Sequence, residues 1–386
     1  MKSVRSFLAA TSVALFLFAC QKNVQRNSAE EPGAQSKAAM DGANGQGSSG
    51  YVYTLSNQTS GNKVLVYSRT SSGKLSYMAC YPTGGTGTGG GLGNQGAIAL
   101  ADHSPLLIAV NAGSNSISSF MVSNSGLQWV STVSSGGTTP VSVTIHNNIV
   151  YVLNAGGTGN IHGFMVYADG SLHPIAGSSR PLSAANAGAA QISFVADGSS
   201  VAITEKATNK IITYTIDAAG NPGMMHSITS AHPTPFGFAV GKKGVIYVSE
   251  AAGGAPNASA VSSYQINSSG MISLIEGPVS AQTAACWVVI TNNGKYVYTT
   301  NTGSNSISSF NTNNMGALSI LSAAAAMTGI GTAPIDAALT NNSKYLYVLN
   351  SGDESIGSFS VNNDGSLAAI ETVSGLPNGA TGLVAK

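Results

Sequence analysis

A motif of about 16 residues recurs seven times along the chain, and this repetition limits the fold more than any other feature. Three copies show it clearly: LIAVNAGSNSISSFMV (107–122), VYTTNTGSNSISSFNT (297–312) and LYVLNSGDESIGSFSV (346–361). With a diverged first copy, the same motif position falls at Ser56, Asn111, Asn154, Glu205, Glu250, Asn301 and Asn350. Seven copies over residues 51–386 give a period of about 48 residues, which matches one four-stranded blade of a propeller.

Each copy reads as four short strands, which we name A to D from the axis of the ring outward. Alternating apolar positions in short runs give the period of two that is typical of strands. The turns carry residues that tolerate positive φ: Asp169-Gly170, Asp197-Gly198, Asn293-Gly294 and Asp364-Gly365. The sequence therefore predicts an all-β, seven-bladed β-propeller over residues 51–386. An open array of hairpins is the alternative.

The two ends of the repeat region predict how the ring closes. The first copy begins directly at its Tyr-Val strand and has no inner strand. The chain ends with NGATGLVA (378–385), which aligns with the inner strands of the other copies. We expect this C-terminal segment to form the inner strand of the first blade, which would cover two exposed sheet edges.

Composition excludes several classes of protein. Only 8% of the 386 residues are charged and the net charge is +1, so a basic face for nucleic acid is not expected. Hydrophobic residues reach 43%, which is enough for a sizeable core. We expect a monomer without a cofactor, and nothing after residue 20 is long and apolar enough to suggest a transmembrane helix.

The N-terminus has the features of an export signal. Lys2 and Arg5 precede an apolar stretch over residues 7–19, and Leu17-Phe18-Ala19-Cys20 resembles the lipobox of bacterial lipoproteins. This predicts a signal peptide over 1–19, a lipidated Cys20 with a flexible tether over 20–50, and contact with the membrane through the lipid only. Gln21, rather than Asp, favours the outer membrane of the cell envelope. An ordinary signal peptide with an incidental Cys20 is the alternative.

The two other cysteines, Cys80 and Cys286, each lie in an apolar run that reads as a strand. We expect both to be small buried side chains. A disulfide between them is the less favoured alternative, because the repeat places them in different blades.

The repeated Tyr-Val-x-Asn, Gly-x-x-Ser-Ile-x-x-Phe and Asp-Gly-x-Leu elements resemble the lactonase family of seven-bladed propellers. That family includes 6-phosphogluconolactonase and the fungal carboxymuconate-lactonizing enzyme. The resemblance covers residues 51–386, although surface-layer propellers with a Tyr-Val-Thr-Asn repeat share these elements. It implies the propeller fold, and it implies lactone hydrolysis only where the site residues also match.

Most positions that the resemblance assigns to the active site are changed. The His-x-His of the fourth inner strand aligns with 188–191 (GAAQ), and the Gly-Pro-Arg-His of the fifth aligns with 234–237 (TPFG). The Ile-His-Ile-Thr of the sixth aligns with 288–291 (VVIT), and an arginine is replaced by Thr302. One acidic position is matched, by Glu250.

Glu250 is therefore the candidate catalytic residue, and Glu205 occupies the same repeat position in the neighbouring blade. This position opens the loop between strands B and C, on the face where propellers usually bind ligands. Two carboxylates there could share a proton or a cation. Alternatively, each glutamate replaces a loop-capping asparagine, with Lys206 as a local partner. Further candidates for ligand binding near this face are as follows: Lys206, Arg180, His232, Phe236 and Trp287. For Phe236 and Trp287, which lie in or beside inner strands, packing in the core is the favoured alternative to lining the channel.

Other patterns carry less chemistry. The six histidines show no spacing typical of a metal site, so no metal is expected. The glycine-rich stretches 83–96 and 251–260 lack the Lys-Ser/Thr ending of a phosphate-binding loop and read as connecting segments. The sequence favours a non-catalytic module that binds a carbohydrate, a lactone or an envelope protein. The alternative is a lactonase with a re-purposed active site.

Overall fold

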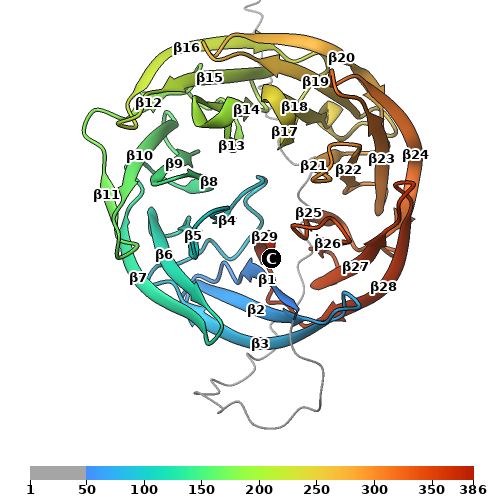
Figure 1. The fold of residues 1–386 in the computed structure, drawn as a ribbon, viewed down its shortest axis with the longest axis horizontal. Helices are drawn as coiled ribbons and strands as arrows, with labels where there is room; N and C mark the ends of the chain where they lie inside the picture. Colours follow the sequence, from blue (N-terminus) through green and yellow to red (C-terminus); the bar gives the residue numbers. More distant parts are fainter. Residues whose placement is uncertain (1–48) are drawn as a thin grey trace, which may run out of the picture.

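The computed structural model describes residues 49–386. The signal peptide (1–19), Cys20 and nearly all of the tether (20–50) lie outside the described residues. Seven antiparallel sheets stand around a central axis, as Figure 1 shows, which confirms the all-β seven-bladed propeller. Strand A of each blade lies at the axis and strand D at the rim, so B–C loops and D–A connections share one face and A–B and C–D turns the other.

The blades follow the seven sequence copies, and the strands of each run in the order A to D. Blade 1 contains β29 (Thr381–Ala385), β1 (Gly50–Leu55), β2 (Lys63–Arg69) and β3 (Leu75–Pro82). Blade 2 contains β4 (Ile98–Leu100), β5 (Leu106–Asn111), β6 (Ser116–Ser123) and β7 (Gly126–Ser134). Blade 3 contains β8 (Pro140–His146), β9 (Ile149–Asn154), β10 (Asn160–Val166) and, sharing the rim position, β11 (Leu172–Pro174) and β12 (Arg180–Pro181).

The remaining blades each have four strands. Blade 4 contains β13 (Ala189–Val195), β14 (Ser200–Glu205), β15 (Lys210–Ile216) and β16 (Pro222–Thr229). Blade 5 contains β17 (Pro235–Val240), β18 (Val245–Glu250), β19 (Ala260–Ile266) and β20 (Ile272–Ser280). Blade 6 contains β21 (Ala285–Ile290), β22 (Tyr296–Asn301), β23 (Ser306–Thr312) and β24 (Leu318–Met327). Blade 7 contains β25 (Pro334–Leu339), β26 (Tyr345–Asn350), β27 (Ser355–Val361) and β28 (Leu367–Ser374). Three short 3-10 turns lie at η1 (Ala196–Gly198), η2 (Lys242–Gly244) and η3 (Ala252–Gly254).

The C-terminal strand closes the ring as predicted. β29 pairs with β1 in antiparallel register, with Val52 opposite Ala385 and Thr54 opposite Leu383. The N–H of Lys386 donates to the carbonyl of Tyr51 at 2.8 Å, and the N–H of Tyr51 donates back at 3.0 Å. In Figure 1 the C-terminal end lies beside β1 near the middle of the ring. The first and last segments of the propeller therefore share one sheet.

In blades 3, 6 and 7, the tyrosine of the repeated B strand donates its hydroxyl to a glycine carbonyl in the C–D turn of the next blade. Tyr298 donates its hydroxyl to the carbonyl of Gly365 in the C–D turn of blade 7 at 2.9 Å, and Tyr347 reaches Gly73 of blade 1 at 2.9 Å. Gly365 has a φ of 83°, in the left-handed region that favours glycine. An added Cβ at Gly365 would lie 2.4 Å from the ring of Tyr296. In these blades, the tyrosine of the B strand and the glycine of the next C–D turn thus form one inter-blade contact.

The expected burial of the two cysteines is confirmed for one and wrong for the other. Cys286 is fully buried in the inner strand of blade 6. Cys80 is an exposed free thiol on β3, so the alternative of a disulfide between the two is also wrong. β3 is the outermost strand of its blade, and no further strand covers it. An apolar run in the sequence does not distinguish such an edge strand from an inner one.

Candidate functional site

Glu205 and Glu250 end the B strands of blades 4 and 5 and are fully buried at the B–C loop face. Each lies opposite the first residue of its C strand, Lys210 and Ala260 respectively. The repeat therefore places both carboxyl groups at matching points of neighbouring blades, as the sequence predicts.

The carboxylate of Glu250 is surrounded by four donors. Oε1 accepts hydrogen bonds from the Ser230 hydroxyl at 2.6 Å, the Tyr264 hydroxyl at 2.8 Å and the His232 backbone N–H at 3.1 Å. Oε2 accepts a bond from the Ser262 hydroxyl at 2.6 Å. Burial, together with the nearby charge of Glu250, raises the pKa of Tyr264 above its usual range. All four donors belong to blade 5 and the connection that enters it.

Glu205 has a separate set of partners. Its carboxylate accepts bonds from the Ser183 backbone N–H at 2.8 Å, from the Ser183 hydroxyl and from the Thr208 hydroxyl at 2.5 Å. Ser183 lies in the connection that enters blade 4, and Thr208 lies in the B–C loop of that blade. The two glutamates therefore do not point into a common pocket. Each one ties its own B strand to its own neighbouring loops.

The asparagines at the equivalent position make the same kind of connection with the opposite polarity. Asn301 donates its side-chain N–H groups to the hydroxyls of Ser306 and Ser308, at 3.1 and 2.9 Å. Glu250 instead accepts from Ser262 on the C strand. Because a serine hydroxyl can donate or accept, the same strand geometry suits either residue. This arrangement agrees with the loop-capping alternative.

Three of the predicted ligand-binding residues meet in the channel. The rings of Phe236 on β17 and Trp287 on β21 are buried, with centroids 5.0 Å apart. The ammonium of Lys206 lies 4.7 Å from the centroid of the Phe236 ring. Although the Lys206 side chain is only partly buried as a whole, its ammonium end is desolvated, which lowers the pKa of Lys206 to about 8. The capping alternative supposed that Lys206 pairs with Glu205. The structure instead directs its ammonium to Gly93 and Phe236, so this part of the alternative is wrong. We call Lys206, Phe236 and Trp287 the channel cluster.

The glycine-rich loop 83–97 crosses the channel and contacts this cluster. It leaves blade 1 and enters blade 2, yet its tip, Gly93–Gln95, bonds to blades 3, 4 and 6 (Figure 1). Lys206 Nζ donates to the carbonyl of Gly93 at 2.5 Å, and Trp287 Nε1 donates to the carbonyl of Asn94 at 2.6 Å. The Gln95 amide makes two bonds with the main chain of Val288, at 2.9 and 3.1 Å. The loop is thus an ordered plug rather than a plain connection, and sequence reasoning missed this role.

The length of the 83–97 loop is the sequence feature that could have indicated its role as a plug. It takes 15 residues, whereas the other D–A connections take four to seven. Short connections suffice to lead a chain from one blade to the next, so the excess length indicates a second role.

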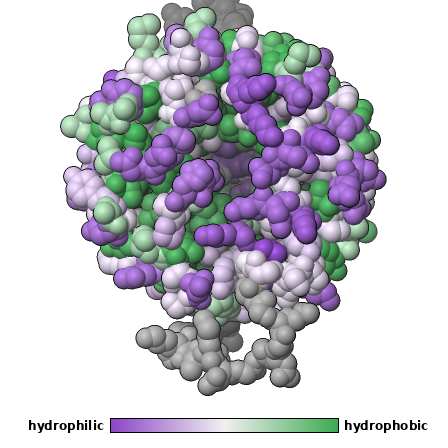
Figure 2. Space-filling model, in the orientation of Figure 1, coloured by the Kyte–Doolittle hydropathy of each residue, from purple (hydrophilic) through white to green (hydrophobic). Residues whose placement is uncertain are grey.

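Figure 2 shows hydrophilic residues gathered around the hollow at the centre of the ring.

The remaining candidates lie outside the channel cluster. Arg180, on the short rim strand β12, donates to the carbonyls of Gly177 and Pro222, both at 2.8 Å, and also to that of Ser179. His232 contributes its backbone N–H to Glu250, and its ring Nε2 lies 2.7 Å from the carbonyl of Ala258. Among the described residues, Arg180 makes no hydrogen bond to Glu205 or Glu250. The contacts of His232 stabilise the connection in which His232 itself lies.

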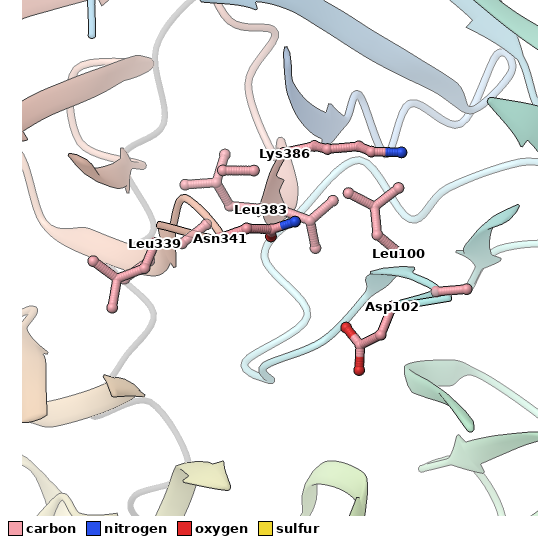
Figure 3. A pocket seen from close by; sticks show the side chains of 11 residues that line it. Leu100, Asp102, Leu339, Asn341, Leu383 and Lys386 are labelled. Atoms are coloured by element: carbon pink, nitrogen blue, oxygen red, sulfur yellow. The ribbon is translucent and has the colours of Figure 1, made fainter. Parts of the chain in front are cut away.

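A shallow cavity of about 280 Å³ opens at the other end of the channel. Figure 3 shows its lining, which comes from β4, β25, β29 and the turns that follow them: Leu100, Asp102, Leu339, Asn341, Leu383 and Lys386. Asp102, Asn341 and Lys386 are exposed, so water screens their charges and dipoles. None of the predicted site residues lines this cavity.

Asp336 is a second residue that sequence reasoning missed. It lies in the inner strand β25, is 2% exposed, and lines a neighbouring cavity of about 280 Å³ with Gln95 and Gln191. Burial raises the pKa of Asp336 well above its usual range, and hydrogen bonds from the N–H groups of Ala337 and Leu383 offset this only in part. A single acidic residue inside the apolar run PIDAAL was the signal.

This buried acid predicts a pH-dependent stability. Because the native state holds the Asp336 proton more tightly than the unfolded chain, the free energy of unfolding falls as pH rises above about 4, the ordinary range of an aspartate. Asp336→Asn replaces the neutral acid with its isostere. We expect the variant to match the wild type near pH 4 and to exceed its free energy of unfolding at pH 8 by on the order of 1–3 kcal/mol. Urea unfolding across this pH range measures it, and an unchanged pH slope in the variant would contradict it.

Two other kinds of functional element have no candidate among the described residues. Within residues 49–386, no three His, Cys, Asp or Glu side chains are placed together so that they could hold a metal ion. The same part of the chain contains no helix with the length and apolar character needed to cross a membrane.

Comparisons with known proteins agree with this fold. Residues 226–337 match the family model described as lactonase, 7-bladed beta-propeller. A search among curated proteins finds no significant match. A Bacteroides fragilis protein described with 6-phosphogluconolactonase as its suggested activity has a TM-score of 0.70 and 17% identity, covering 88% of this chain and 98% of its own. The periplasmic gluconolactonase PpgL of Pseudomonas aeruginosa has a TM-score of 0.66 and 16% identity, covering 86% and 98%.

The same fold also accompanies different chemistry. The hydrazine synthase of Kuenenia stuttgartiensis has a TM-score of 0.56 and 15% identity, covering 75% of this chain and 91% of its own. At such identities the likeness establishes architecture, and activity must be argued from the site. The sequence repeat and the closed ring identify the chain as a seven-bladed β-propeller, and the part over residues 226–337 is similar to the lactonase family model.

Proposed function

We propose that this chain is a lipid-anchored cell-envelope protein whose propeller binds a ligand or a partner protein through its B–C loop face and does not hydrolyse lactones. The bonding of Glu250 is the observation that carries the non-catalytic part. A general acid or base must reach the proton that it transfers, within about 3 Å. Glu250 is fully buried, and four donors of its own blade already occupy its oxygens.

Lactone hydrolysis is the competing candidate, and one observation favours it. The lowered pKa of Lys206, about 8, leaves part of the amine neutral near neutral pH, where it can accept a proton. The fold neighbour from Pseudomonas aeruginosa is described as a gluconolactonase. Against this candidate, Lys206 is already bonded to the carbonyl of Gly93. The family positions that would supply histidine and arginine carry other residues at 188–191 and 234–237.

The proposed anchor fits the geometry of the described ends. Ser49 donates its backbone N–H to the carbonyl of Arg69, and β1 starts beside Lys386 on the face of the A–B turns. A tether from a lipidated Cys20 would approach this face and leave the B–C loop face directed away from the lipid. Labelling with a palmitate analogue tests the anchor. Label that persists in Cys20→Ala would contradict it.

Binding without consumption is the expected behaviour. A ligand present at 100 times its dissociation constant adds about 2.7 kcal/mol to the free energy of unfolding. We expect a carbohydrate, a sugar acid or a lactone to raise the melting temperature of the purified protein by several degrees while its concentration stays constant. A thermal melt of the protein with each compound, followed by chromatography of the compound, measures both. A panel that gives no shift, while a lactone disappears faster than it does in buffer, would contradict the proposal.

A further inference from the structure

The ammonium of Lys206 is a desolvated charge that has only neutral partners. Within residues 49–386, these partners are the Gly93 carbonyl at 2.5 Å and the face of Phe236 at 4.7 Å. Buried charges in proteins are normally paired with a charge of opposite sign. A charge-assisted bond to a carboxylate is roughly twice as strong as one between neutral groups. The loop tip that covers this ammonium therefore gives it a hydrogen bond but no partner of opposite charge.

The tip itself fits its place imperfectly. Asn94 is 2% exposed, and its side-chain oxygen has no hydrogen-bond partner. A buried acceptor left without a donor costs about 1–3 kcal/mol. Gly93 and Gly96 flank this part of the tip with φ values of 60° and 83°, which gives the segment two glycine hinges.

The base of the same loop is fixed independently of the tip. Asn57 on the B–C loop of blade 1 donates to the carbonyl of Gly90 at 2.7 Å and accepts from the N–H of Thr88 at 3.0 Å. Displacing Gly93–Gln95 from the channel cluster would therefore leave the base of the loop in place. The segment between base and tip has one large apolar side chain, Leu92.

We propose that the tip Gly93–Gln95 is an internal substitute ligand, and that a small carboxylate with an apolar face competes with it for the channel cluster. This inference rests on the proposed binding function and names its site and ligand class. One carboxylate oxygen takes the place of the Gly93 carbonyl on Lys206, and the other oxygen or a hydroxyl takes that of the Asn94 carbonyl on Trp287. The apolar face of the ligand lies on the ring of Phe236.

Tryptophan fluorescence can report this exchange directly. The chain has two tryptophans, and Trp129 is 51% exposed on β7, so Trp129→Phe leaves Trp287 as the single reporter. The probes are cyclohexanecarboxylate and its uncharged carboxamide. We expect the carboxylate to shift the Trp287 emission to longer wavelength in a saturable way, and the carboxamide to bind at least tenfold more weakly.

Three variants in this background complete the test. Lys206→Met is expected to lower the carboxylate affinity at least tenfold, while Lys295→Met, an exposed lysine on the opposite face, leaves it unchanged. Asn94→Gly/Gln95→Gly loosens the tip and is expected to raise the affinity about tenfold, with circular dichroism confirming the fold. Equal affinity in the tip variant and its parent, or no binding by the tip variant at millimolar probe, would overturn the inference. A carbohydrate, sugar acid or lactone that raises the melting temperature and binds Lys206→Met as tightly as its parent would overturn this inference while leaving the proposed function intact.

Discussion

Deleting residues 376–386 is expected to leave a protein that aggregates, or that melts roughly 10 °C or more below the wild type. The deletion removes β29, which is the inner strand of blade 1. It also removes Leu376 and Leu383, which are 3% and 5% exposed in the core of the ring. Burial of these two side chains contributes roughly 3–6 kcal/mol, against a total stability of about 5–15 kcal/mol for a typical domain.

Lys386→Ala is the matched control for this deletion. Its exposed side chain is removed, while its main-chain atoms keep the two bonds to Tyr51. We expect it to melt within about 1 °C of the wild type, because exposed surface changes are usually worth less than 0.5 kcal/mol. Light scattering and a thermal melt compare the variants, and a truncated protein with the melting temperature of the wild type would refute closure by β29.

Glu250→Ala is expected to lower the free energy of unfolding by about 3 kcal/mol or more. The substitution leaves three buried hydroxyls and a backbone N–H without the acceptor that they share, at Ser230, Ser262, Tyr264 and His232. Glu250→Gln keeps one acceptor oxygen, and the Ser262 hydroxyl can turn to accept from the new amide. We expect this variant to lose only about 1 kcal/mol.

Asn301→Ala gives the comparison at the same repeat position in blade 6. Asn301 makes hydrogen bonds to two serine hydroxyls, whereas Glu250 accepts from four donors. Asn301→Ala is therefore expected to lower the free energy of unfolding by about 1 kcal/mol. Urea unfolding of the three variants should therefore rank Glu250→Ala as the least stable. Wild-type stability in Glu250→Ala would show that the carboxylate does not act as a structural cap.

The repeat predicted the architecture because it reports local rules that apply in every blade. Strand alternation, Asp-Gly turns and the missing first inner strand are all readable along the chain, and closure through β29 follows from them. Cys80 was placed wrongly because an apolar run does not reveal whether its strand lies at the rim or at the axis. The sequence also could not show that Glu250 accepts hydrogen bonds where the asparagines donate them, because a serine hydroxyl can be the partner of either side chain.

The channel cluster illustrates what sequence reasoning cannot supply. Lys206, Phe236 and Trp287 were each candidates, but their meeting point depends on a loop from the far side of the ring. Gln95 and Val288 are separated by 193 positions in the sequence. Their bonds arise only when all seven blades close the ring, and no local pattern encodes that distance.

The turnover of lactones by the wild-type protein is the measurement that tests the central claim most directly. Five- and six-membered sugar lactones, with and without a phosphate group, should be incubated with the protein at neutral pH, and the acid released should be titrated. The structural role of Glu250 predicts rates equal to spontaneous hydrolysis in buffer. Turnover above that rate would contradict the account. Its loss in Glu250→Gln, with the melting temperature within a few degrees of the wild type, would assign the catalysis to Glu250, and its loss in Lys206→Met would assign it to Lys206.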